Sequence, residues 1–318
     1  MVANAVELTV EQAWYLAELT GSGSFPWVLA ITPPYSEPSA GAAFAADRTA
    51  ELSELGVLSG NGSVNPAVVR WIRSTCLARQ WLELRVVSPG GDMLRGVVGR
   101  RGERSDGKTA QGERSDGKTA QGERSDGIVV VALRSGGLVT FTEVDLADPR
   151  DVVPVVTAGL QGRRPADFDE FTLPMRAGAR ADEKLRGGAD LAEVVAHLGI
   201  PASARPVVEA VFTGPRSYVE IVAGEHRDGY RVSTEVGVSV VDCGAGRILV
   251  HPQRAFDGEW VSTFTPGAAP AIAAAVDRLT ASLPDGSWFA DARSARLSAA
   301  PSDRDFEQRT ENRCPTTL

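Results

Sequence analysis

One motif in the sequence has the residue types and spacing of a phosphate-binding loop. Residues 102–121 consist of two identical ten-residue copies of Gly-Glu-Arg-Ser-Asp-Gly-Lys-Thr-Ala-Gln, and a third copy stops at Gly127. Each complete copy satisfies the spacing G-x-x-x-x-G-K-T, in which backbone N–H groups and a lysine surround the phosphates of a nucleotide. The lysines concerned are Lys108 and Lys118. Nucleotide binding or hydrolysis by this repeat is therefore one candidate function.

The surroundings of the motif argue against that chemistry. A phosphate loop needs a helix that begins directly after the lysine, so that the helix dipole points at the phosphates. Here the polar repeat starts again instead, and its Gly, Ser, Asp and Thr residues disfavour a helix and provide no apolar face to anchor one. Asp242 could supply a magnesium-binding carboxylate, but any buried strand that ends in Asp looks the same. We interpret the repeat as a solvated hairpin extension.

The remaining titratable residues form no catalytic or metal-binding pattern. The three histidines, His197, His226 and His251, are far apart in the sequence. The three cysteines, Cys76, Cys243 and Cys314, form no Cys-x-x-Cys pair of the kind found in zinc and redox sites. There is also no G-x-S-x-G segment that would mark a serine nucleophile. We predict a protein that is not an enzyme and has no catalytic residues, no metal and no cofactor.

The composition argues against nucleic acid and membrane partners. The 318 residues include 33 Lys and Arg against 41 Asp and Glu, which gives a net charge of −8. Such a balance does not favour a broad cationic surface for a phosphate backbone. The apolar stretches fall far short of the roughly 20 residues that cross a bilayer, and the first residues lack the pattern of a secretory signal. We expect a cytoplasmic protein with reduced cysteines.

The N-terminal half is predicted to contain helices, then strands, then a helix. Thr9 and Gln12 have the spacing of a capping box, and Asn65 followed by Pro66 is typical of a helix start. Helical periodicity predicts helices over residues 9–21, 42–55 and 65–77. Alternating patterns predict strands over residues 81–87, 93–99, 128–134 and 138–144, with a helix over residues 148–160 after them. Short polar connections favour antiparallel neighbours.

The C-terminal half repeats this order. Helices are predicted over residues 190–198 and 205–212, strands over residues 218–222, 229–234, 236–243, 247–251 and 259–264, and a helix over residues 268–283. Two such halves could join their strands into one sheet. The predicted fold class is α+β, with a central, mainly antiparallel sheet, flanking helical bundles and two halves related by a pseudo-two-fold axis.

The expected boundaries follow from composition. Residues 1–165 form the N-terminal half, with the polar repeat inserted at 100–127, and residues 166–294 form the C-terminal half of the same domain. Residues 162–184, rich in Arg, Pro, Gly and Asp, are expected to connect the halves. Residues 295–318 are polar and are expected to form a flexible tail. All six tryptophans are expected in the core: Trp14, Trp27, Trp71, Trp81, Trp260 and Trp288.

Four segments carry a resemblance to a known family. They are residues 7–18 (ELTVEQAWYLAE), 25–31 (FPWVLAI), 65–72 (NPAVVRWI) and 81–87 (WLELRVV). In these segments the chain resembles the EspG family, the cytosolic chaperones of mycobacterial type VII (ESX) secretion. The resemblance extends more weakly along residues 5–290. It implies a protein with no cofactor or reaction that binds PE–PPE heterodimers at the helical tip of the PPE subunit.

The resemblance also implies where a partner binds. In that family the contact surface comes from the central sheet, the loop between its second and third strands, and the C-terminal helices. The corresponding loop here is 100–127. Strand alternation places Met93, Arg95 and Val97 on an open face, with Leu94 and Val98 toward helices. The expected partner-binding residues are Met93, Arg95, Val97, Arg100, Arg101, Arg104, Asp106, Arg231, Ser233 and Glu235.

A chaperone for an apolar helical tip needs a partly apolar patch rimmed by charge, and this physical requirement is independent of the resemblance. The leading interpretation is therefore a chaperone that keeps a PE–PPE pair soluble and delivers it for secretion. Free protein is expected as a monomer or weak homodimer. A scaffold that dimerises through sheet edges is a third interpretation, and would self-associate without any partner.

Overall fold

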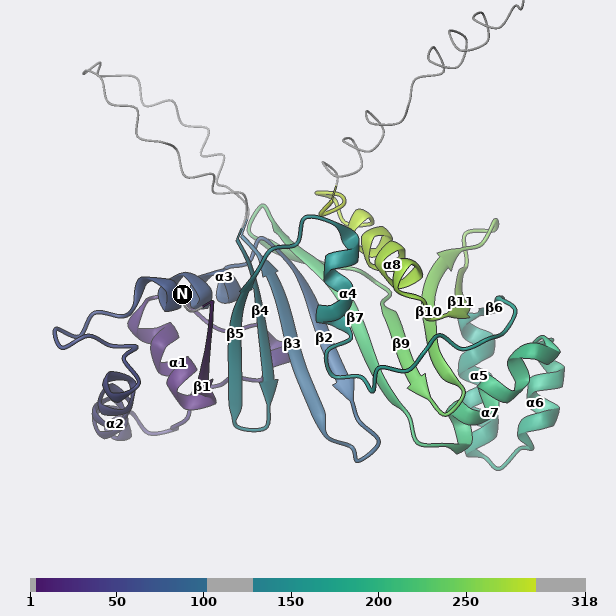
Figure 1. Cartoon of the computed structure of the whole chain (residues 1–318), viewed down its shortest axis with the longest axis horizontal. Coiled ribbons are helices and arrows are strands. Elements are labelled where there is room, and N and C mark those ends of the chain that lie inside the picture. The colour runs from purple at the N-terminus through teal and green to yellow at the C-terminus, as the bar shows by residue number, and fades with distance from the viewer. Residues whose placement is uncertain (1–3, 102–127, 290–318) are drawn as a thin grey trace, which may run out of the picture.

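The computed structural model describes residues 4–101 and 128–289 (Figure 1). The predicted insert, including Arg104, Asp106, Lys108 and Lys118, lies almost entirely outside the described residues, as does the predicted tail. The N-terminal half contains β1 (Ala5–Thr9), α1 (Val10–Leu19), η1 (Trp27–Leu29), η2 (Pro38–Ala40), α2 (Gly41–Glu54), α3 (Pro66–Cys76), β2 (Gln80–Val87), β3 (Met93–Arg100), β4 (Val129–Ser135), β5 (Leu138–Val144), η3 (Pro149–Asp151) and α4 (Val152–Val156).

The C-terminal half repeats this order with one additional short strand. It contains β6 (Phe171–Pro174), α5 (Met175–Arg186), α6 (Leu191–His197), η4 (Ala202–Ala204), α7 (Arg205–Thr213), β7 (Ser217–Arg227), β8 (Tyr230–Ser233), β9 (Val238–Cys243), β10 (Gly246–Arg254), β11 (Trp260–Pro266) and α8 (Ala269–Ala281). Each half therefore runs from a strand through helices into a strand meander and a closing helix.

The strands of both halves form one sheet. Its order is β1-β5-β4-β3-β2-β7-β9-β10-β11-β6, and β8 pairs with β7 outside this path. Every ladder in the sheet is antiparallel. The halves meet at β2 and β7, which pair along their length from Gln80 opposite Glu225 to Val87 opposite Tyr218. The strand order outward from this central pair is the same in both directions, as the predicted pseudo-two-fold relation requires.

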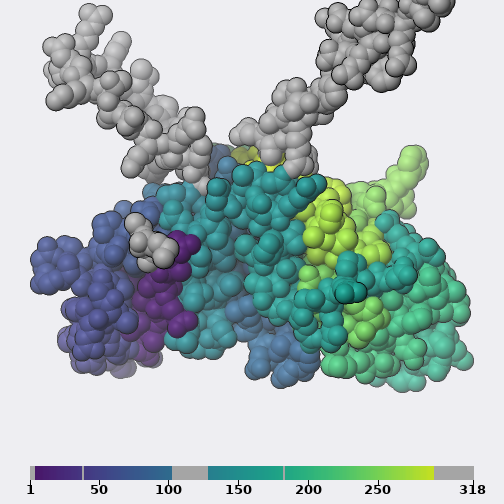
Figure 2. Space-filling view, in the orientation of Figure 1, coloured from purple at the N-terminus to yellow at the C-terminus, as the bar shows by residue number. Residues whose placement is uncertain are grey.

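Helices cover both faces of this sheet. On one face, α4 and α8 pack on a continuous core that includes Leu84, Val98 and Ile221 (Figure 1). Figure 2 shows α8 and the chain that contains α4 lying across the middle of this face. On the opposite face, α1–α3 cover an N-terminal core around Trp71 and Phe141, and α5–α7 cover a C-terminal core around Val207 and Ile248.

Local signals set several helix starts as predicted. The Thr9 hydroxyl accepts a hydrogen bond from the Gln12 backbone N–H, and the Gln12 side chain accepts one from the Thr9 N–H, which completes a capping box. Asn65 accepts a bond from the Ala67 N–H at the start of α3, where Pro66 removes an N–H that would have no partner. Both caps fix where a bundle helix begins relative to the strand beside it.

Some predicted boundaries are wrong. The segment 162–184 contains elements that were not predicted, because β6 lies within it and pairs with β11 from Phe171 to Pro174, and most of α5 follows. The strand β1 was not predicted, although it pairs with β5 along the edge of the sheet. The predicted helix over 148–160 is a shorter η3–α4 pair. In each case the pairing or packing partner is distant in the sequence.

Candidate partner-binding site

The two bundles leave the middle of one sheet face accessible. Here, where β2 and β7 meet, Arg85 and Glu220 are exposed, and Met93 at the start of β3 is 42% exposed. Their neighbours on this face are half-buried. We call the following side chains the central floor: Glu83, Arg85, Val87, Met93, Arg95, Tyr218, Glu220 and Val222. Charged and apolar groups alternate across it, which is the composition expected of a protein-binding surface.

Sheet register aligns a row of charges across the central floor. Glu220 of β7 lies directly opposite Arg85 of β2, and Arg85 lies opposite Arg95 of β3. Arg95 in turn lies opposite Arg134 of β4. The next row toward the β2–β3 turn is apolar or aromatic and contains Tyr218, Val87 and Met93. The floor therefore offers a charged strip beside an apolar one.

One wall of the central floor comes from η1, which packs against β3 and β2. Arg134 fixes the end of this turn by donating hydrogen bonds to the carbonyl oxygens of Leu29, at 2.8 Å, and Ala30. Burial, and then the charge of Arg95, lowers the pKa of Arg134. Trp27, at the start of η1, is 85% exposed, so the prediction of a core tryptophan is wrong at this position. The exposed indole beside the floor is a candidate contact that sequence reasoning missed.

Trp81 and Arg231 lie at the end of the central floor where β2 begins. The Arg231 guanidinium lies 4.6 Å from the Trp81 ring centroid and forms an ion pair with Glu83. Trp81 also packs on His226, with ring centroids 4.8 Å apart, and on Gly224, where any side chain would overlap the indole. Because Arg231 is already paired, its charge is largely compensated within the chain.

A second feature is an apolar cavity of about 250 Å³ in the C-terminal half, between α5–α7 and the sheet. Nearly all of its lining groups are apolar side chains, including Phe212 at the end of α7, which is 46% exposed. Phe171 and Phe264 stack there with their centroids 4.7 Å apart. An apolar cavity of this kind can accept an aliphatic or aromatic side chain.

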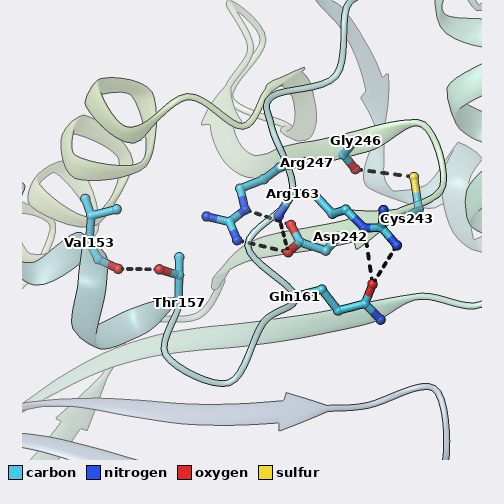
Figure 3. Close-up of polar contacts among 8 residues, drawn as sticks. All are labelled: Val153, Thr157, Gln161, Arg163, Asp242, Cys243, Gly246 and Arg247. Atoms are coloured by element: carbon cyan, nitrogen blue, oxygen red, sulfur yellow. Dashed lines mark hydrogen bonds and ion pairs between the residues drawn. The ribbon is translucent and has the colours of Figure 1, made fainter.

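Asp242, the carboxylate that a magnesium site would need, is occupied within the fold (Figure 3). Its two oxygens accept bonds from Arg247 Nε at 2.7 Å and Nη2 at 2.9 Å, and from the backbone N–H of Arg163 at 3.2 Å. Burial alone would raise the pKa of Asp242, but the bonds and charge of Arg247 and the backbone amides hold it below its ordinary value. Asp242 of β9 thus joins the segment after α4 to β9 and, through Arg247, to β10.

The predicted partner-binding residues do not all lie together. Met93, Arg95, Arg231 and Ser233 share the accessible face of the sheet. Val97 shares it by register but is fully buried under the N-terminal bundle, so the expectation of an open position there is wrong. The partner role of the others stays a prediction.

Three further predicted residues lie away from the floor. Arg100 points to the α8 side, where it donates a 2.7 Å bond to the Trp288 carbonyl. Arg101 is exposed just beyond β3. Glu235 lies beyond the end of β8, close to Arg254 and Trp260. Arg104 and Asp106 lie outside the described residues.

The described part of the chain shows no site for a metal ion. Across residues 4–101 and 128–289, no group of three or more His, Cys, Asp and Glu side chains is arranged to hold one. In the same residues, none of the helices has the length and hydropathy of a membrane span. The accessible sheet face and the apolar cavity are therefore the candidate binding features of the described residues.

Comparison with known proteins identifies relatives along most of the chain. A model of the EspG family matches residues 9–278. The ESX-3 secretion-associated protein EspG3 of Mycolicibacterium smegmatis is 57% identical over 308 residues, covering 97% of this chain and 94% of the relative. EspG3 of Mycobacterium tuberculosis is 56% identical over 298 residues, covering 92% of this chain and 96% of the relative.

A solved structure has the same fold. It is the Mycobacterium tuberculosis type VII secretion system chaperone EspG5 in complex with the PE25–PPE41 dimer, with a TM-score of 0.70 and 19% identity. The match covers 90% of this chain and 99% of that one. At this identity the likeness establishes the fold. The fold and the family match together give no support to the nucleotide-binding alternative.

Proposed function

The chain belongs to the EspG family, and on that premise we propose that it is a type VII secretion chaperone that binds a PE–PPE heterodimer. It contacts the helical tip of the PPE subunit, keeps the pair soluble and delivers it to the secretion machinery. The observation that carries this proposal is the family match over residues 9–278. The EspG5 relative of the same fold, solved with a PE–PPE dimer bound, supports the class of partner.

The two EspG3 relatives also suggest which system the protein serves. Both are named as ESX-3 secretion-associated proteins and share more than half of their residues with this chain over nearly its full length. We propose that the substrates of this chain belong to the ESX-3 system. The protein acts in the cytoplasm without catalysis or a cofactor, and is a monomer or weak homodimer when free.

The physical basis of binding is a match between surfaces. An isolated apolar helical tip aggregates, so its chaperone must cover apolar area while remaining hydrated around it. The central floor provides Val87, Met93 and Tyr218 next to a charged row. Trp27 adds a rigid aromatic group at the edge, of a residue type that often dominates interface energetics. The cavity of the C-terminal half can receive an apolar side chain.

Co-expression with candidate PE–PPE pairs tests this function. We expect size-exclusion chromatography with light scattering to show a ternary complex containing one copy of each chain, unaffected by ATP or magnesium. A matched Lys108→Ala/Lys118→Ala variant should form the same complex. If no PE–PPE pair of any ESX system binds, the proposal is contradicted. Assembly that requires ATP and is lost in the lysine variant would favour the nucleotide-binding alternative.

A further inference from the structure

The arginines of the central floor indicate how the chain recognises its partner, and this inference rests on the proposed function. We propose that Arg85 and Arg95 together bind a carboxylate of the partner, an Asp or Glu side chain that lies beside the apolar tip of the PPE subunit. The site is the pair of guanidinium groups on adjacent strands. Its specificity is for an acidic residue at one position of an otherwise apolar helix end.

Register brings these arginines together. Arg85, Arg95 and Arg134 lie directly opposite one another on β2, β3 and β4, and all three belong to the same sheet face. Neighbouring strands are about 4.8 Å apart, so three cationic side chains start from adjacent positions. Like charges directly opposite each other in a sheet are destabilising. The arrangement is therefore unfavourable for the free protein.

The chain itself supplies little compensation for this charge. Arg134 donates to the carbonyls of Leu29 and Gly136, which satisfy its N–H groups without removing its charge. Within the described residues, neither Arg85 nor Arg95 forms an ion pair. Glu220 lies opposite Arg85 at the far end of the row from Arg95 and is exposed.

The nearest other carboxylate on this face is unavailable. Glu83 lies two residues before Arg85 on the same strand, and it is paired with Arg231. The floor and its edge thus hold four guanidinium groups, of Arg85, Arg95, Arg134 and Arg231, against two carboxylates. This local positive excess occurs on a chain whose net charge is −8. A negative group from a partner would complete the row.

The geometry fits a carboxylate with apolar surroundings. A guanidinium forms two parallel hydrogen bonds to a carboxylate, which gives geometric specificity as well as attraction. Met93 and Val87 lie in the next row along the same strands, two residues from Arg95 and Arg85. A helix end with one acidic side chain and an apolar neighbour would place the two groups on these two rows.

Single Arg85→Gln and Arg95→Gln variants test this site against a matched control. Arg150→Gln removes the same charge from an exposed position in η3, which packs against α8 on the other side of the sheet. Affinity for the PE–PPE pair is measured by biolayer interferometry in 50 and 300 mM NaCl. We expect each floor variant to bind roughly tenfold more weakly in 50 mM salt, with a smaller difference in 300 mM, because screening weakens exposed charge interactions. The control should bind like the wild type.

Melting temperatures of the free chains separate binding from folding. Because Arg95 lies between Arg85 and Arg134, Arg95→Gln should melt at the same temperature as the wild type or higher. Arg85→Gln relieves the repulsion with Arg95 but also loses the charge opposite Glu220, so it should melt at the wild-type temperature. Replacing the acidic tip residue of the partner by Lys should weaken the wild-type complex, and Arg95→Glu should restore part of the affinity.

The outcomes distinguish this inference from the proposed function. Wild-type complex formation with unchanged affinity in both floor variants would remove the inference and leave the proposed function intact. A lower melting temperature in the floor variants would assign the arginines to folding and also remove the inference. If the wild type binds no PE–PPE pair, the proposed function fails and the inference fails with it.

Discussion

Replacing Asp242 by Asn should destabilise the folded chain strongly. The Asp242 side chain is completely buried and that of Arg247 is 12% exposed, and two hydrogen bonds of 2.7 and 2.9 Å join them (Figure 3). Asn preserves the shape but leaves the Arg247 charge buried without a counter-charge. Removing one partner of a buried ion pair lowers the free energy of unfolding by about 3–5 kcal/mol. At roughly 2–4 °C per kcal/mol for a chain of this class, the melting temperature should fall by about 6–20 °C.

The same variant should change how stability depends on pH. The pKa of Asp242 in the folded state is below its ordinary value of about 3.9, so the folded state favours the ionised carboxylate. Its contribution is therefore fully present above the unfolded pKa and is lost as the pH falls through the folded pKa. The difference in unfolding free energy between the wild type and Asp242→Asn should be constant from pH 7 to about 5 and should shrink below pH 4.

Two further variants make the measurement specific. Asp257→Asn removes a carboxylate from the exposed β10–β11 turn, where its oxygen accepts the Glu259 N–H, and it should change the melting temperature by no more than about 2 °C. Asp242→Asn/Arg247→Met removes both charges and should recover part of the loss. Melting of Asp242→Asn within about 2 °C of the wild type at pH 7, or a deficit that persists unchanged at pH 3, would contradict this role of Asp242.

Two other predictions concern the tryptophans and the insert. Trp71 is buried and its indole N–H donates a 2.8 Å bond to Glu143, so Trp71→Ala should lower the unfolding free energy by about 3–5 kcal/mol in a urea titration. Trp27→Ala should change the unfolding free energy by no more than about 0.5 kcal/mol and should weaken PE–PPE binding. A loss of unfolding free energy as large as that of Trp71→Ala would contradict the assignment of Trp27 to the surface. Deleting residues 112–121 should leave the melting temperature within about 2 °C, because loop-closure entropy changes by only about 0.6 kcal/mol per doubling of loop length; a larger fall would assign the repeat a folding role.

Local signals in the sequence predicted the elements that depend on neighbours along the chain. Thr9 and Asn65 cap helices because their side chains reach backbone N–H groups two or three residues ahead. The strand 93–99 was predicted from alternation, and β3 occupies nearly those residues. By contrast, Phe171–Pro174 is too short and too rich in polar surroundings to signal a strand. It becomes one because β11 offers it an edge, and that edge is invisible in the local sequence.

For the candidate site, the sequence predicted which residues of a strand share one face of the sheet, but not which of them are accessible. Alternation correctly separated Arg95 from Leu94, which packs on the α4–α8 side. It could not show that Val97, two residues after Arg95 and on the same face, lies under the N-terminal bundle. Nor could it show that Trp27, inside the apolar run 25–31, points away from the core. Both facts depend on where a bundle ends over the sheet, which is decided by packing between segments distant in sequence.

The two halves share a topology but fill their bundle cores differently, and the comparison indicates which half can adapt. The N-terminal core contains large buried rings such as Phe25, Trp71 and Phe141, which occupy the space between helices and sheet. The equivalent C-terminal bundle relies more on Val, Leu and Ala, and it leaves the cavity of about 250 Å³. Unfilled apolar volume forfeits dispersion contacts, so the C-terminal bundle is held to the sheet more weakly per buried residue. A partner side chain that entered the cavity would restore those contacts, so of the two bundles the C-terminal one has the unfilled apolar volume in which an added side chain could improve packing.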